Sequence, residues 1–264
     1  MKTPLDTRVE KLKQQGYDLS LNKVLDDAFS AWKKILFMGI VYVLFSYLFS
    51  NLVSLFLSNI LGTKDLDTEF SNSIMSLSQK PNGFTEMIPL FQEYMYNPLI
   101  LSKAFISSFI NLLIFPMGAG LIYCAYQADK TGTTSFKDLI RGFQGNKFIN
   151  LLGLTIIVSV VTLLSAFLLF IPLLYIIPAF LLAGAFIIID EVSLSKAIKN
   201  SIKIVNMNFG KVLLVSVVSF LISKVLGVAM CGIGLIITIP YSFAIVYSVY
   251  KNTIETVKTE DISE

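Results

Sequence analysis

Histidine is absent from this 264-residue chain. That absence excludes His-ligated metal sites, haem with a proximal histidine, and catalytic triads that use a histidine base. Cysteine is also scarce. Its two copies, Cys124 and Cys231, both lie in apolar stretches, where a free cysteine behaves as a small hydrophobic side chain. We therefore expect no metal, no cofactor and no disulfide framework.

Charge is sparse as well. Charged residues make up 15% of the chain, against about 25% in soluble domains, and hydrophobic residues make up 55%. The longest charge-free stretch covers residues 148–189, between Lys147 and Asp190. These 42 residues suffice for two membrane crossings of about 20 residues each, with a break at Ile171-Pro172. The composition predicts one all-helical integral membrane domain.

Six apolar segments can be assigned as transmembrane helices. They cover residues 35–61, 104–128, 149–170, 173–189, 212–227 and 233–250. The last two are separated by Cys231-Gly232-Ile233-Gly234. Lys224 lies near the end of the fifth segment, where a long side chain can extend to the headgroups, so we interpret it as a snorkelling anchor.

Basic residues predict the orientation of these spans. Seventeen of the 21 lie on one side: in the N-terminal segment, in the 129–148 and 190–211 loops, and at the C-terminus. The positive-inside rule places that side, with both termini, in the cytoplasm. The long 62–98 loop then faces outward and is acidic, with Asp65, Asp67, Glu69, Glu86 and Glu93.

The spans form three similar units. Each unit begins with a short amphipathic pattern before an odd-numbered span, beginning near Leu21, Phe136 and Leu194, with Ser135 and Asp138 as a capping box before the second. Each even-numbered span contains a proline, and Pro116, Pro178 and Pro240 are 62 residues apart. We predict a polar cytoplasmic tail (1–18), three helical hairpin units (19–128, 129–189 and 190–250) and a second cytoplasmic tail (251–264).

Two features have alternative interpretations. The prolines, with Gly118 and Gly120 beside Pro116, can either kink the helices around a cavity or let them pack closely. The amphipathic segments can either pack as the cytoplasmic ends of the spans or bind anionic lipid headgroups or a partner. In both cases the packing interpretation is favoured, and the other stays open.

The acidic pair Asp190-Glu191 ends the fourth span. It could act as a general base or cation site, but we expect it to cap the helix that follows, where negative charge favours the N-terminal dipole. No carboxylate is predicted inside a span, which argues against proton-coupled transport and intramembrane hydrolysis. The chain has no phosphate-binding loop or hydrolase motif, and its short basic loops lack the aromatic residues of a nucleic-acid surface.

Two stretches resemble a broad family of bacterial six-span proteins. They are Tyr17–Lys34, with its Ala28-Phe29-Ser30-Ala31-Trp32 core, and Ile188-Ile189-Asp190-Glu191 followed by Ala197, Ser201 and Asn208-Phe209-Gly210-Lys211. That family includes the membrane domain attached to some glycerophosphodiester phosphodiesterases. The resemblance covers most of the chain and implies a bacterial cytoplasmic membrane, but it implies no catalytic residues. This sequence lacks the soluble phosphodiesterase domain, so that activity does not carry over. Some relatives carry an enzyme name for carotene cleavage, but that chemistry needs a histidine-bound iron and this chain has no histidine.

These observations favour a non-enzymatic membrane protein that scaffolds, regulates or assists an envelope protein partner. The alternative is a transporter or lipid-handling protein with a cavity at the proline-containing helices. An intramembrane enzyme is disfavoured because the spans lack suitable side chains. A solid bundle would favour the scaffold, and a polar cavity at the midplane would favour the transporter.

Overall fold

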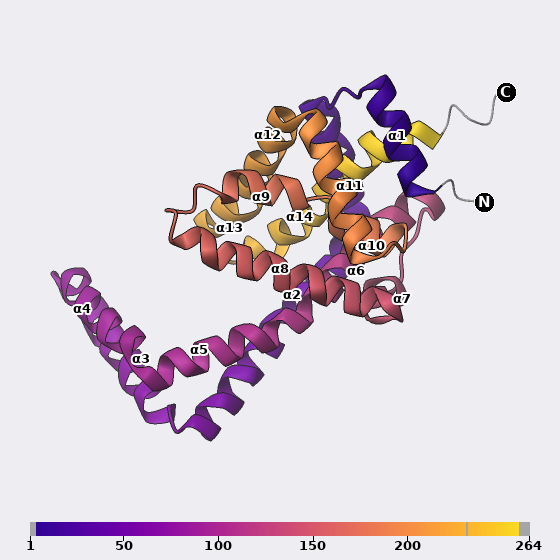
Figure 1. The fold of residues 1–264 in the computed structure, drawn as a ribbon. Helices are drawn as coiled ribbons and strands as arrows, with labels where there is room; N and C mark the ends of the chain where they lie inside the picture. Colours follow the sequence, from indigo (N-terminus) through magenta and orange to yellow (C-terminus); the bar gives the residue numbers. More distant parts are fainter. Residues whose placement is uncertain (1–3, 231, 259–264) are drawn as a thin grey trace. The chain divides into compact units, whose positions relative to one another are not determined.

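The computed structural model describes residues 4–230 and 232–258, and every regular element in these residues is helical (Figure 1). The chain divides into two compact units: unit 1 comprises residues 1–44 and 114–264, and unit 2 comprises residues 45–113. Lys2, Cys231 and the last six residues of the predicted C-terminal tail lie outside the described residues.

The helices follow one another with short connections. In chain order they are α1 (Leu5–Gln15), α2 (Leu21–Leu61), α3 (Lys64–Ser78), α4 (Gly83–Tyr96), α5 (Pro98–Asn111), η1 (Leu112–Ile114), α6 (Phe115–Thr131), α7 (Phe136–Leu139), η2 (Arg141–Phe143), α8 (Asn146–Ala166), α9 (Leu173–Phe180), α10 (Ala183–Ile189), α11 (Leu194–Met207), α12 (Phe209–Phe220), the π-helical η3 (Leu221–Leu226), α13 (Gly227–Ala229), α14 (Leu235–Tyr250), the π-helical η4 (Lys251–Glu255) and η5 (Thr256–Lys258).

Four helical stretches are long and apolar enough to cross a membrane. They are Leu21–Leu61, Pro98–Thr131, Asn146–Ser165 and Phe209–Ala229. Much of their apolar surface is exposed, as at Phe37, Leu52 and Leu163, which is the pattern of helices that face lipid. The chain therefore has the character of a helical membrane protein.

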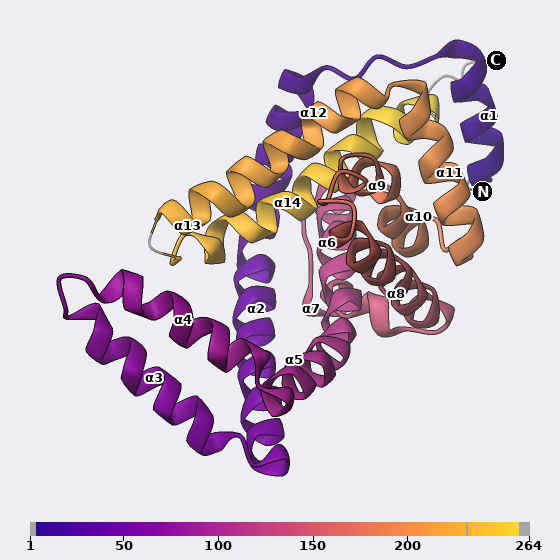
Figure 2. The same cartoon turned by 60° about the vertical axis from the view of Figure 1, so that its left-hand side comes forward.

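The core of unit 1 is built around α6 and α10. Every residue of α10 is buried, and α6 packs against α7, α8, α10 and α14. Figure 2 shows α12 and α14 side by side as the two arms of a hairpin, and η3 and α13 continue the first arm against α14. The α8 arm returns through α9 and α10 after a turn at residues 167–172, so the predicted break at Ile171-Pro172 is confirmed.

The amphipathic segments differ from one another in length. The first is continuous with the first span in α2, because Lys33 and Lys34 are good helix formers and nothing interrupts the helix. The second is reduced to α7 and η2. Its predicted capping box is confirmed, with the Ser135 amide donating to Asp138 at 2.8 Å. The third is the 14-residue α11, which buries Ala197, Ile204 and Val205.

The described residues of both predicted cytoplasmic tails include helical segments. Residues 5–15 form α1, which packs against α11, η4 and η5 through Leu5, Val9 and Leu12. After Tyr250 the chain continues as η4, in which Thr253 and Ile254 are buried. A few apolar residues among many charged ones are thus enough to dock a short helix, and the cytoplasmic location of both segments stays a prediction.

In unit 2 the predicted 62–98 loop is a helical hairpin. Helices α3 and α4 pack against each other across a short polar turn, and Phe70 stacks on Tyr94 with ring centroids 4.0 Å apart. The sequence of this segment is amphipathic rather than loop-like, with Leu66 and Leu77 among its acidic and hydroxyl residues. Asp65, Glu69, Glu86 and Glu93 are exposed, whereas Asp67 is half-buried.

Candidate functional site

The most deeply buried charges of unit 1 come from three helices. Arg8 lies on α1, Asp190 follows the last turn of α10, and Tyr250 ends α14. The Arg8 guanidinium donates to Asp190 at 2.5 Å, and the Tyr250 hydroxyl lies 3.1 Å from the same carboxylate. The side chains of Arg8 and Asp190 are each only 3% exposed. We call these three residues the Arg8 triad.

Burial and charge oppose each other at Arg8. Removal from water disfavours its positive charge, but the adjacent Asp190 carboxylate and Tyr250 outweigh that effect, and the net result raises the pKa of Arg8. The guanidinium therefore stays charged. Its Nε is buried and has no hydrogen-bond partner among the residues that the structure describes, so the carboxylate of Asp190 is the main compensation for the desolvated charge.

Glu191, the next residue, has a different environment. Its carboxylate is 50% exposed and accepts from Arg141 at 2.7 Å and Lys147 at 3.1 Å. The hydrogen bond from Lys147 is the largest cause that lowers its pKa, with a smaller contribution from Arg141. The expected capping role of Asp190-Glu191 was wrong: Ser193 is the N-cap residue of α11, and both carboxylates are engaged by basic side chains of other elements.

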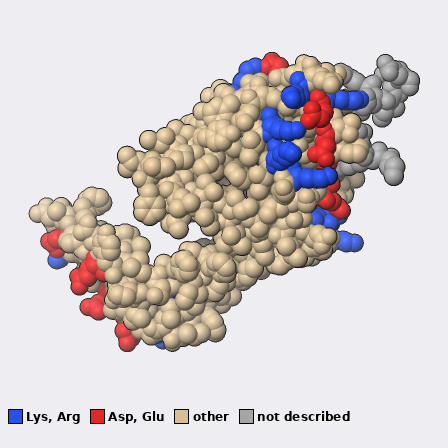
Figure 3. Space-filling model, viewed as in Figure 1, with Lys and Arg blue, Asp and Glu red and all other residues tan. Residues whose placement is uncertain are grey.

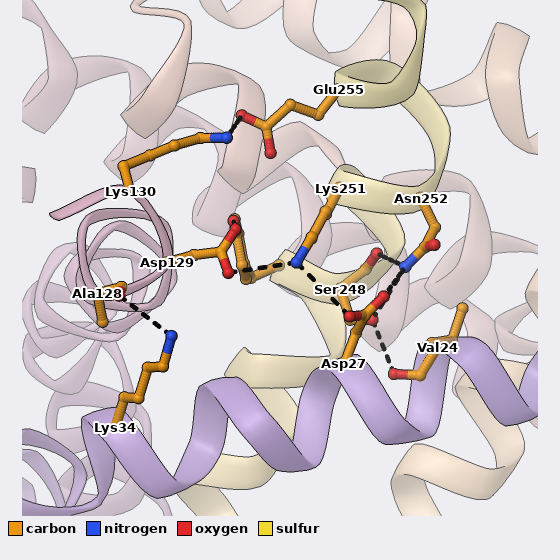
Figure 4. A network of polar contacts seen from close by, with 11 residues as sticks. Val24, Asp27, Lys34, Ala128, Asp129, Lys130, Ser248, Lys251, Asn252 and Glu255 are labelled. Carbon is orange, nitrogen blue, oxygen red and sulfur yellow. Dashed lines mark hydrogen bonds and ion pairs between the residues drawn. The ribbon is translucent and has the colours of Figure 1, made fainter. Parts of the chain in front are cut away.

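A second polar network joins α2, α6 and η4 (Figure 4). Lys251 lies between two carboxylates, 3.2 Å from Asp129 and 3.5 Å from Asp27. Asn252 donates to Asp27 at 2.8 Å, and the Ser248 hydroxyl donates to the Val24 carbonyl at 2.7 Å. Lys130 pairs with Glu255 at 3.0 Å, and Lys34 donates to the Ala128 carbonyl at 3.4 Å. We call this set the Lys251 network.

Pairs between α1 and α11 complete the charged end of unit 1. Asp6 accepts from Lys196 at 3.3 Å and from Asn200 at 2.9 Å, and Glu10 pairs with Lys203 at 2.9 Å. The hydrogen bond from Asn200 is the largest cause that lowers the pKa of Asp6. In Figure 3 the charged side chains of unit 1 gather mainly over α1 and α11, whereas the visible surface over α9 is uncharged.

The predicted kink residues lie in close contacts between elements. A Cβ on Gly120 would lie 1.8 Å from the Leu139 carbonyl oxygen, and one on Gly142 would lie 2.0 Å from that of Pro116. A Cβ on Gly39 would lie 2.4 Å from the Pro240 ring. These glycines let backbones approach closely, which is the arrangement that packing requires.

The prolines themselves occupy different positions in their helices. Pro178 and Pro240 lie inside α9 and α14, whereas Pro116 lies in the first turn of α6, where a proline removes no helical hydrogen bond. All three are buried. Gly118 lies against Phe243 and Tyr42, again at a packed contact. Lys224, the expected snorkelling anchor, is exposed in η3.

Unit 2 has one polar centre of its own. Asp67 accepts from Lys103 at 2.6 Å, from the Tyr94 hydroxyl at 2.6 Å and from the Ser58 hydroxyl at 2.7 Å. Burial alone would raise the pKa of Asp67, but the hydrogen bonds from Lys103, Tyr94 and Ser58 outweigh it and lower the pKa. The carboxylate thus joins α2, α3, α4 and α5.

Taken together, these groups form ion pairs and hydrogen bonds with one another. Within residues 4–230 and 232–258 no group of three or more His, Cys, Asp or Glu side chains is arranged to hold a metal ion. Sequence reasoning named Asp190, Glu191 and Lys224 but missed Arg8, Tyr250, Asp129 and Lys251. The sequence does contain a hint of the residues at the end of α14, since Tyr247, Tyr250 and Lys251 place polar atoms at the end of an apolar segment.

Comparison with known proteins gives no further assignment. No protein-family model, no curated protein and no solved structure matches this chain.

Proposed function

We propose that this chain is a non-enzymatic, multi-pass protein of a bacterial cytoplasmic membrane that acts as a scaffold, regulator or accessory protein for an envelope partner. Its six apolar segments form three hairpin units, and its two termini and basic loops lie in the cytoplasm. The acidic residues of α3 and α4 then face outward. The bacterial assignment rests on the resemblance of residues 17–34 and 188–211 to the membrane-domain family described above.

The observation that carries this proposal is the close packing at the proline and glycine positions. A transporter would need an open path there, whereas Gly39, Gly120 and Gly142 are pressed against a proline ring or backbone carbonyls. The buried charges support the same conclusion, because the Arg8 triad and the Lys251 network tie helices to one another.

Native Cys124 provides a direct test. It lies in α6 two turns beyond Pro116 and is buried. In a Cys231→Ser background, a solid bundle predicts that Cys124 in native membranes stays unmodified by a small, membrane-permeant maleimide and reacts after denaturation. Rapid modification in the native state would favour the transporter or lipid-handling alternative. Ala104→Cys, at an exposed position on α5, serves as the accessible control.

The partner is tested separately. Neutralising the exposed acidic residues of unit 2, by Asp65→Asn, Glu69→Gln, Glu86→Gln and Glu93→Gln together, should reduce the proteins that crosslink to this chain from the outer side. The matched control neutralises Asp6 and Glu10 on α1 and should leave the same crosslinks intact. Equal crosslinking in all three proteins would contradict a role for the acidic hairpin.

A further inference from the structure

We infer that the two C-terminal hairpins, α8–α10 and α12–α14, enter the membrane from the side of the basic loops, turn within the hydrocarbon and return to that side. Their turns would then contact lipid acyl chains instead of water. This inference rests on the proposed function only in placing the basic loops together on one side. It reduces the complete crossings to two, α2 and α5–α6.

The lengths of the returning arms limit how far each hairpin reaches. The arm from Leu173 to Ile189 has 17 residues, about 26 Å at 1.5 Å per residue, and it ends at Asp190-Glu191. Helix α14 has 16 residues, about 24 Å, and it ends at Lys251. A bilayer's hydrocarbon is about 30 Å thick. If the charges stay at one boundary, both returning arms begin before the opposite boundary. The outgoing arms, Asn146–Ser165 and Phe209–Ala229, have 20 and 21 residues, about 30 Å, so they must tilt to match that depth.

The helices of the first hairpin unit are longer than the hydrocarbon is thick. Helix α2 has 41 residues, and the helical stretch Pro98–Thr131 has 34, so each exceeds the length of a full crossing. They lead to and from the polar α3–α4 hairpin, which carries the exposed acidic residues. The first unit thus has two long helical stretches joined by a polar segment. The other two hairpins, α8–α10 and α12–α14, have shorter returning helices and apolar turns.

The side chains of the first turn are all apolar and point outward. Residues 167–171 read Phe-Leu-Leu-Phe-Ile, and Phe167 and Leu169 are 82% and 83% exposed. At the second turn, Val228, Met230 and Ile233 are exposed as well. The exposed Lys224 precedes this turn, and its long side chain reaches the headgroups if the turn lies close to the opposite boundary. An aqueous turn of this composition would leave several large side chains in water, whereas contact with acyl chains removes that cost.

The backbone of the first turn is prepared for a medium without water. The amides of Leu168 and Phe170 both donate to the Ser165 carbonyl, at 3.1 and 2.8 Å, and the Ile171 amide donates to Leu168 at 3.1 Å. The next residue, Pro172, has no amide hydrogen to satisfy. Backbone groups in hydrocarbon must find partners inside the protein, and most donors of this turn do so.

Two residues of this turn have a backbone conformation that is costly for residues with a side chain. Leu169 and Phe170 have positive φ angles of 51° and 60°, a region that disfavours residues with a side chain. Three of the polar connections place glycine at such positions, Gly62, Gly132 and Gly145, whereas the polar α10–α11 connection places Glu191 there. Large apolar residues at positive φ fit a turn whose surroundings favour apolar side chains enough to offset the strained backbone.

Cysteine accessibility tests the inference. In a Cys124→Ala, Cys231→Ala background, Phe167→Cys and Ile233→Cys would probe the two turns, with Ser76→Cys and Ser135→Cys as controls for the two sides. A membrane-impermeant maleimide should label the Ser76 variant in intact cells and the Ser135 variant only after permeabilisation. The two turn variants should be labelled in neither state, although all four should react after denaturation in detergent.

A depth measurement separates lipid contact from burial against protein. Bimane attached at Phe167→Cys in the purified, reconstituted chain should be quenched several-fold more strongly by lipids carrying a nitroxide on the acyl chain than by headgroup nitroxides. Labelling of the turn variants in intact cells, or equally weak quenching by both lipids, would overturn the inference. A reversed Ser76 and Ser135 pattern with unlabelled turns would instead overturn the proposed orientation and support the hairpin inference.

Discussion

The two units hold their buried charges in different ways. In unit 1, Arg8 pairs with Asp190, which is 182 residues away, and the Lys251 network reaches back to Asp27. In unit 2 the side-chain partners of Asp67 are Ser58, Thr63, Tyr94 and Lys103, so all lie within 36 residues. The charged end of unit 1 therefore requires nearly the whole chain, whereas the polar centre of unit 2 forms within one consecutive segment.

The carboxylates of Asp190 and Asp67 also differ in burial. The Arg8 and Asp190 side chains are almost completely removed from water, whereas Asp67 and Lys103 keep part of their exposure. A buried charge that loses its partner keeps its full desolvation cost, while a partly exposed one can recover hydration. The stability of unit 1 should thus fall far more than that of unit 2 when one carboxylate is lost.

Asp190→Asn should have the largest effect. It leaves the Arg8 guanidinium buried without a counter-charge, which costs about 3–5 kcal/mol in the free energy of unfolding. Thermal or denaturant unfolding of the purified protein in detergent measures the loss. Because replacing both partners removes the unpaired charge, the double variant Arg8→Met, Asp190→Leu should recover most of the stability. A melting temperature for Asp190→Asn within a degree of the parent protein would contradict the role of the triad.

Gly120→Ala tests whether close backbone packing, in addition to the ion pairs, holds unit 1 together. The added methyl group would lie 1.8 Å from the Leu139 carbonyl oxygen, so α6 and α7 must separate, at a cost of about 1–3 kcal/mol. Gly184→Ala is the matched control: it also lies in a buried helix, but its nearest neighbour, Ile122, is 3.9 Å from the added carbon. We expect Gly184→Ala to melt at or above the parent temperature, and equal losses in the two variants would argue against the close contact.

Asp67→Asn is the corresponding change in unit 2. It keeps the size of the side chain but removes the charge that accepts from Lys103, Tyr94 and Ser58, so we expect a loss of about 1–2 kcal/mol. The effect should be local. Hydrogen exchange should accelerate in α3, α4 and α5 and stay unchanged in α10. Faster exchange spread equally over α10 would show that the loss of this carboxylate is not confined to unit 2.

The sequence predicted the helical membrane character of the chain because that character depends on local hydrophobicity. The charge-free 148–189 stretch, its break at Ile171-Pro172 and the capping box at Ser135 and Asp138 all depend on neighbouring residues, and the structure contains each of them. Local patterns were ambiguous at residues 62–98. The many polar residues there predicted a loop, although the spacing of the apolar residues is sufficient for two helices.

The Arg8 triad could not be predicted from local patterns. Nothing in the composition of residues 1–18 shows that Arg8 is buried while the neighbouring Glu10 is exposed. Its burial follows from the docking of α1 on α11, about 190 positions away in the sequence, and on η5, about 250 positions away. The same limitation explains the capping hypothesis for Asp190 and Glu191, since adjacent carboxylates were treated as a pair although the fold turns them toward different partners.

The smallest predicted effect comes from the exposed member of that pair. The pKa of Glu191 is lowered from its ordinary value of 4.5, mainly by the hydrogen bond from Lys147. A lowered folded-state pKa contributes stability that is fully present above the ordinary value and is lost as the pH falls through the folded-state pKa. Because the carboxylate is half-exposed, this contribution should be below about 1 kcal/mol. Glu191→Gln should thus lower the melting temperature only slightly at pH 7, and the difference from the parent should vanish near pH 3. If the difference in melting temperature persists at low pH, Glu191 stabilises the protein through packing or hydrogen bonding and not through its charge. Asp190 and Glu191 would then differ only in how deeply they are buried.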